Sequence, residues 1–191
     1  MRSPPSPATL PPSKTSSGFG RLPLDRARSR LAASTTTRKL VLAALFAAMG
    51  VLLSSFAIPV GASRVFPFQH ALNVVAGVLL GPWWAAGSAL VTATLRVSLG
   101  TGSLFAFPGS PFGAIAVGLA YKFLRRDEAA FFEPVGTVLV GATVGAVLIS
   151  PLLEGVTGGF IALMISFALS SIPGAVIGYL LLKALRRTRA I

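Results

Sequence analysis

The sequence predicts an all-α membrane protein, a bundle of about six transmembrane helices with both termini in the cytoplasm. Of its 191 residues, 53% are hydrophobic and only 12% are charged, whereas roughly a quarter of a soluble domain is charged. A soluble fold of this size could not hide so much apolar surface from water. The basic residues, which give a formal net charge of +12, gather near the ends and in one internal loop, as membrane topology requires.

Two regions of different composition follow one another along the chain. Residues 1–37 are rich in Pro, Ser, Thr and Arg and lack the apolar periodicity that a packed core requires, so we expect a disordered extension outside the fold. A transit peptide has a similar composition. Residues 38–191 are predicted to form the membrane domain.

Basic clusters decide how often the chain crosses the membrane. Two of the apolar segments contain only about 14 residues, fewer than the roughly 20 that span the hydrocarbon core, so hydropathy alone leaves four to six helices open. Basic clusters precede the first segment, follow the fourth and follow the sixth. Six crossings place all three clusters in the cytoplasm, whereas five would place one outside. The predicted helices cover residues 39–59, 67–80, 83–99, 111–124, 134–152 and 158–185.

The residue inventory argues against catalysis and against a resident cofactor or metal. No cysteine is present and His70 is the single histidine, which excludes disulfides, thiolate sites and paired-histidine metal motifs. The sequence contains no phosphate-binding G-x-x-x-x-G-K-[ST] loop, so ATP-driven transport would need an ATPase on another chain. Because topology explains the basic residues, we expect membrane lipid and no nucleic acid as a partner.

The first predicted helix carries two overlapping Ala-x-x-x-Ala ridges, formed by Ala43, Ala44, Ala47 and Ala48. Small residues at this spacing let helices approach closely in lipid. The ridges could pack inside the bundle or meet a separate membrane subunit. The residues alone leave both interpretations open.

Polar and aromatic side chains gather in segments that the six-helix topology places on the outer side, chiefly 64–73 and 96–110. Polar groups at membrane depth are costly unless they pair or face a cavity. Taken singly, each could tie helices together, but a few polar groups among aromatic rings suit a small-molecule pocket. The predicted substrate-binding residues are Phe66, Gln69, His70, Asn73, Arg96, Thr101, Ser103, Phe107 and Ser110.

Arg96 needs an explanation because it lies within an apolar predicted helix. It could snorkel to the interface, pair with Glu154, contact a ligand or organise the following loop, GTGSLFAFPGS. Two glycines in that loop permit unusual backbone angles, and Pro108-Gly109 predicts a turn. Irregular backbone at membrane depth is tolerated where it lines a cavity.

Two blocks, FPFQHALNVVAGVLLGPWWA and RVSLGTGSLFAFPGSPFGAIAVGLAY, resemble the ThiW family, and the similarity covers roughly residues 39–187. These proteins are substrate-binding (S) components of energy-coupling factor (ECF) vitamin transporters. The resemblance implies the six-helix S-component fold in a prokaryotic plasma membrane. It also implies uptake of a thiamine precursor, hydroxyethylthiazole, with a transmembrane coupling protein and two ECF ATPases as partners. In such proteins an Ala-x-x-x-Ala face on the first helix meets the coupling protein, and Ala43, Ala44, Ala47 and Ala48 match it.

The expected function is therefore capture of a thiamine precursor from outside by a subunit that hydrolyses nothing itself. One alternative is a stand-alone secondary transporter, against which the sequence shows no inverted repeat and no buried acidic relay. The other is a structural membrane subunit without a ligand.

Overall fold

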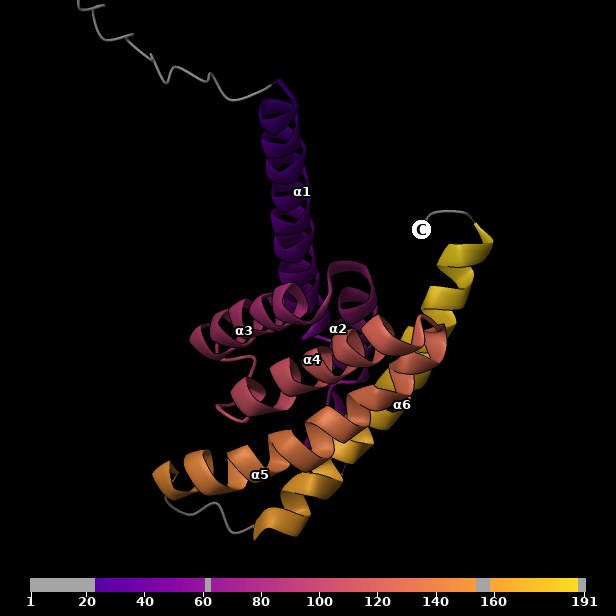
Figure 1. Ribbon diagram of the computed structural model, residues 1–191. Helices are drawn as coiled ribbons and strands as arrows, with labels where there is room; N and C mark the ends of the chain where they lie inside the picture. The colour runs from indigo at the N-terminus through magenta and orange to yellow at the C-terminus, as the bar shows by residue number, and fades with distance from the viewer. Residues whose placement is uncertain (1–22, 61–62, 154–158, 189–191) are drawn as a thin grey trace, which may run out of the picture. The chain divides into compact units, whose positions relative to one another are not determined.

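The computed structural model describes residues 23–60, 63–153 and 159–188, and nearly all of them are helical (Figure 1). The chain divides into two compact units, Met1–Thr35 and Thr36–Ile191. The α-helices with at least one full turn, together with a short hairpin, are α1 (Pro23–Leu53), β1 (Ile58–Val60), β2 (Ser63–Val65), α2 (Pro67–Leu80), α3 (Pro82–Ser98), α4 (Ala106–Leu124) and α6 (Gly159–Arg187).

The segment between α4 and α6 is helical throughout most of its length but irregular. It alternates between tighter 3₁₀ and wider π turns, which are often found at functional sites. The fifth helix was predicted to begin at residue 134, yet helical structure already begins at Asp127. The turns are η1 (Asp127–Phe132), η2 (Val135–Gly141), α5 (Ala142–Val144), η3 (Gly145–Ile149) and η4 (Ser150–Leu152).

Three helical segments are long and apolar enough to cross a membrane: Thr35–Leu53, Asp127–Leu152 and Gly159–Arg187. The apolar helix α2 is shorter than these, at 14 residues. Large apolar side chains such as Phe123 and Trp83 remain 81% and 73% exposed, as lipid-facing residues would be. The predicted all-α membrane bundle is confirmed as a multi-pass protein, while the six crossings and the cytoplasmic termini stay predictions.

The predicted bounds hold best for α2. Pro67 occupies its first turn, where the missing N–H costs nothing, and Gly81 ends it with a φ of +85°. The predicted turn at Pro108-Gly109 is wrong, because both residues lie inside α4. Proline is tolerated in a first helical turn, and the glycine allows close packing against Phe167 of α6. The first helix was predicted to begin at residue 39, but α1 begins at Pro23. Residues 24–33 consist mostly of Arg, Leu and Ala, which favour helix.

Glycines let α2 pack closely on two neighbouring helices. A side chain at Gly77 would overlap Val117 of α4, and one at Gly178 would overlap Val74 of α2. Val74 and Val117 are fully buried and form the core together with Leu182. The helices α2, α4 and α6 therefore form a rigid frame around the site, as close packing of small residues permits in lipid.

The alanine ridges of α1 divide between two faces. Ser88 and Thr92 of α3 donate hydrogen bonds to the carbonyl oxygens of Ala43 (2.8 Å) and Ala47 (3.4 Å). Both alanines are buried there, so they pack inside the bundle and are not available to another subunit. On the other ridge, Ala44 and Ala48 are exposed. The helical period separates the ridges, because adjacent residues point about 100° apart.

Candidate substrate-binding site

A cavity of about 500 Å³ lies between β2, α2, the end of α3, the start of α4 and α6. Its volume falls within the range of small-molecule sites, and its wall mixes aromatic rings with a few polar groups. The aromatic residues of the wall are Phe66, Phe105 and Phe167, and the polar ones are Arg64, Gln69, His70, Arg96, Thr101, Ser103, Ser110, Ser150, Ser166 and Ser170.

The structure brings most of the predicted substrate-binding residues to this one cavity. The residues that line it are Phe66, Gln69, His70, Arg96, Thr101, Ser103 and Ser110. Two predicted residues do not line it. Asn73 is buried one turn further along α2, and Phe107 is half-buried on α4. Asn73 does not line the cavity but bonds to Ser110, which does. Phe107 does not line the cavity.

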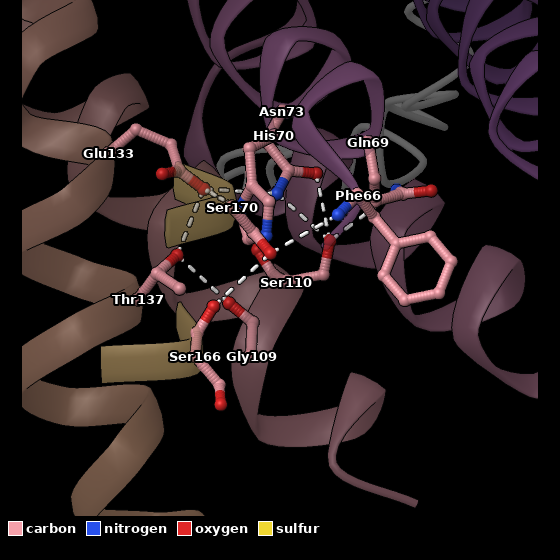
Figure 2. Close-up of polar contacts among 10 residues, drawn as sticks. All are labelled: Phe66, Gln69, His70, Asn73, Gly109, Ser110, Glu133, Thr137, Ser166 and Ser170. Atoms are coloured by element: carbon pink, nitrogen blue, oxygen red, sulfur yellow. Dashed lines mark hydrogen bonds and ion pairs between the residues drawn. The ribbon is translucent and has the colours of Figure 1, made fainter. Parts of the chain in front are cut away.

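Ser110 of α4 joins two side chains of α2 (Figure 2). Its hydroxyl exchanges hydrogen bonds with the Asn73 amide, at 2.9 Å from Nδ2 and 3.0 Å from Oδ1. The amide of Gln69 donates to the same hydroxyl at 3.4 Å. The prediction that Gln69 and Asn73 share one helical face is therefore confirmed, and α2 and α4 are tied together at the cavity.

Arg96 is 4% exposed and contacts the loop that precedes α4. Its guanidinium carbon lies 4.2 Å from the centre of the Phe66 ring, a cation–π contact that offsets part of the cost of burial. Nη2 donates to the carbonyl oxygen of Thr101 at 3.4 Å. Glu154, its predicted ion-pair partner, lies outside the described residues. Arg96 thus organises the loop beside the cavity, one of the roles that the sequence left open.

Glu133 is a functional candidate that the sequence reasoning missed. It is 0% exposed, and its Oε1 lies 2.6 Å from His70 Nδ1 and 3.3 Å from Asn73 Nδ2. Thr137 Oγ1 lies 2.9 Å from the same oxygen and 2.9 Å from the carbonyl oxygen of Gly109. Figure 2 shows these side chains converging on the carboxyl group. The sequence predicted no buried acidic relay, and Glu133 is one buried acidic residue that pairs with His70.

The wall contributed by α6 was also missed. Ser170 accepts a hydrogen bond from the backbone N–H of Phe66 at 3.2 Å and donates to the carbonyl oxygen of Ser166 at 3.3 Å. Serines four residues apart lie on one face of a helix. This spacing was visible in the apolar sixth helix and could have indicated its cavity-facing side.

The fold places the protein in a known structural class. It resembles the crystal structure at 2.1 Å of the S-component for biotin from an ECF-type ABC transporter, with a TM-score of 0.57. The match covers 83% of this chain and 94% of that chain at 18% sequence identity, which shows a shared fold. The protein is thus a multi-pass membrane protein with the S-component fold.

The family follows from the sequence itself. Residues 40–188 match the model of the thiamine-precursor transporter protein family, ThiW, and the chain belongs to this family. The predicted resemblance is confirmed over nearly the same residues. A comparison with curated proteins found no match.

Proposed function

We propose that the chain is the substrate-capture subunit of an ATP-driven ECF importer and binds hydroxyethylthiazole, a thiamine precursor, from the outside. The observation that carries the proposal is the cavity of about 500 Å³ with aromatic and hydroxyl-bearing walls. A thiazole ring would pack against Phe66, and its hydroxyl and ring nitrogen would bond to polar groups of the wall. Membership in a family of thiamine-precursor transporters supports this ligand class.

Calorimetry on the purified protein tests the ligand. Hydroxyethylthiazole should bind at micromolar concentration, and thiamine and the pyrimidine precursor should bind more weakly. Replacing two hydroxyls of the wall, Thr101→Val with Ser103→Ala, should weaken thiazole binding about tenfold, because each hydrogen bond contributes about 0.5–1.5 kcal/mol. Thr94→Val is the matched control, since the Thr94 hydroxyl is exposed and bonds only within α3. Absence of thiazole binding at micromolar concentration would overturn the ligand assignment.

The exposed ridge of α1 is the proposed contact for the transmembrane coupling protein, and two ECF ATPases would supply the energy. Ala44 and Ala48 carry this contact, since the ridge of Ala43 and Ala47 is buried. The double change Ala44→Leu and Ala48→Leu should prevent copurification with the coupling protein and leave thiazole binding unchanged. Ala184→Leu, on the exposed side of α6, is the control. Copurification that survives the double change would refute this contact.

The buried Glu133 favours a second candidate, a stand-alone transporter driven by protons, because buried acidic residues serve as proton relays in such proteins. Proteoliposomes that contain this chain alone distinguish the two. Thiazole uptake driven by a pH gradient would support the stand-alone transporter and contradict the subunit proposal. We expect binding without uptake.

A further inference from the structure

The contact between His70 and Glu133 joins the cavity wall to a fully buried carboxyl group. His70 lines the cavity and is 7% exposed, whereas Glu133 lies behind it and is absent from the wall. His70 belongs to α2, and Glu133 directly follows η1. A polar group in such surroundings is stable only when it is hydrogen-bonded.

The partners of Glu133 indicate that its Oε1 accepts hydrogen bonds. The Asn73 amide nitrogen can only donate, and its identity is set by its 3.1 Å bond to the carbonyl oxygen of Ser110, which can only accept. His70 Nδ1 lies 2.6 Å from the same oxygen, which is within hydrogen-bond distance. Oε1 can accept from both of these partners when His70 carries its proton on Nδ1, whereas the buried Oε2 has no partner among the described residues.

Close packing fixes both groups in place. A side chain at Gly113 would collide with the Glu133 carboxyl group and with Thr137, and one at Gly174 would collide with His70. The backbone of α4 therefore packs directly against the Glu133 carboxyl group, and the backbone of α6 packs against the Cβ atom of His70. With Nδ1 held by Glu133, Nε2 is the ring nitrogen that remains for the cavity.

We propose that Glu133 is a positioning residue that holds His70 as the Nδ1–H tautomer, so that Nε2 presents a hydrogen-bond acceptor to the ligand. The cavity then selects a ligand with a donating group, a hydroxyl or an N–H, at this point. Neutral imidazole has one donor and one acceptor nitrogen, and the partner of one nitrogen decides the role of the other. The ligand half of this inference rests on the proposed function, whereas the tautomer does not.

The tautomer can be measured without a ligand, because the chain has a single histidine. In protein labelled with ¹⁵N-histidine at neutral pH, the NMR shifts should show a protonated Nδ1 and a bare Nε2. Glu133→Gln keeps an acceptor oxygen and should keep this tautomer. Glu133→Leu removes the acceptor at similar volume, and the Nε2–H tautomer should appear. A wild-type signal with Nε2 protonated, alone or together with Nδ1, would overturn the proposal, as would a leucine variant identical to wild type.

Ligand preference provides the second readout. Wild type and Glu133→Gln should bind hydroxyethylthiazole about tenfold more tightly than its methyl ether, which lacks the donating proton. Glu133→Leu should bind the two within about threefold of each other, because a protonated Nε2 no longer accepts. Equal binding of alcohol and ether by wild type would refute the acceptor role. If neither thiazole binds while the NMR result holds, the proposed function fails and the positioning role of Glu133 stands.

Discussion

Gly113 lies on α4 directly opposite the buried carboxyl group of Glu133. A methyl group at this position would collide with that carboxyl group and with the hydroxyl of Thr137. Gly113→Ala therefore forces Glu133 to move, although it is 0% exposed and hydrogen-bonded to His70. The substitution tests whether the carboxyl group is held as tightly as the structure indicates.

The expected loss of stability combines two costs and one gain. Overpacking a buried site costs about 1–3 kcal/mol, and weakening a hydrogen bond to a charged group costs about 1.5–3 kcal/mol more. Alanine favours a helix over glycine by about 0.5–1 kcal/mol. The net loss of about 1.5–5.5 kcal/mol corresponds to a fall in Tm of roughly 3–22 °C for a chain of this length.

Thermal unfolding in detergent, followed by tryptophan fluorescence, measures this change. Gly87→Ala on α3 is the matched control, because no atom lies within 4 Å of a side chain added there. The control should unfold at the wild-type temperature or slightly above it. If Gly113→Ala unfolds together with the control, Glu133 is not confined and the argument from close packing fails.

Two pairs of substitutions can be checked by the same assay. Arg186→Gln removes bonds of 2.8 and 2.9 Å to the Asp127 carboxylate and should lower the free energy of unfolding by about 1–3 kcal/mol. Lys183→Gln should lower it by less than about 0.5 kcal/mol, because the 4.0 Å pair of Lys183 with Glu128 is exposed. Equal losses of stability in the two variants would contradict this prediction. Ala43→Leu should lower the free energy of unfolding by about 1–3 kcal/mol, because Ala43 is buried and the larger side chain overpacks the site. Ala44→Leu should leave stability almost unchanged, because Ala44 is exposed. A larger loss in Ala44→Leu than in Ala43→Leu would show that α1 is rotated.

The sequence predicted those helices whose ends carry local signals. Pro67 and Gly81 mark the ends of α2, and the structure uses both. Most of the candidate site could also be predicted, because polar residues such as Gln69 and Arg96 stand out against an apolar background. Such residues must pair or face a cavity whatever the tertiary arrangement.

Glu133 could not be placed by the same reasoning. It follows a basic cluster and precedes Pro134, so the sequence pattern assigned it to a loop at the cytoplasmic side. In the structure, the 3₁₀ turns of η1 (Asp127–Phe132) carry the chain along α4. Glu133, which follows these turns, lies 2.6 Å from His70 of α2. A contact between residues 63 positions apart depends on tertiary packing, which no local pattern records.

The pairing of Glu133 with His70 also bears on how the chain enters the membrane during synthesis. A carboxylate that reaches the bilayer centre on an isolated helix is opposed by about 2.5–3.5 kcal/mol, and the residues after Glu133 are strongly apolar. His70 lies earlier in the chain and is therefore inserted first. An α2 that is already in place offers His70 as a partner for the Glu133 carboxyl group, so this contact favours an order of assembly in which α2 precedes the fifth helix.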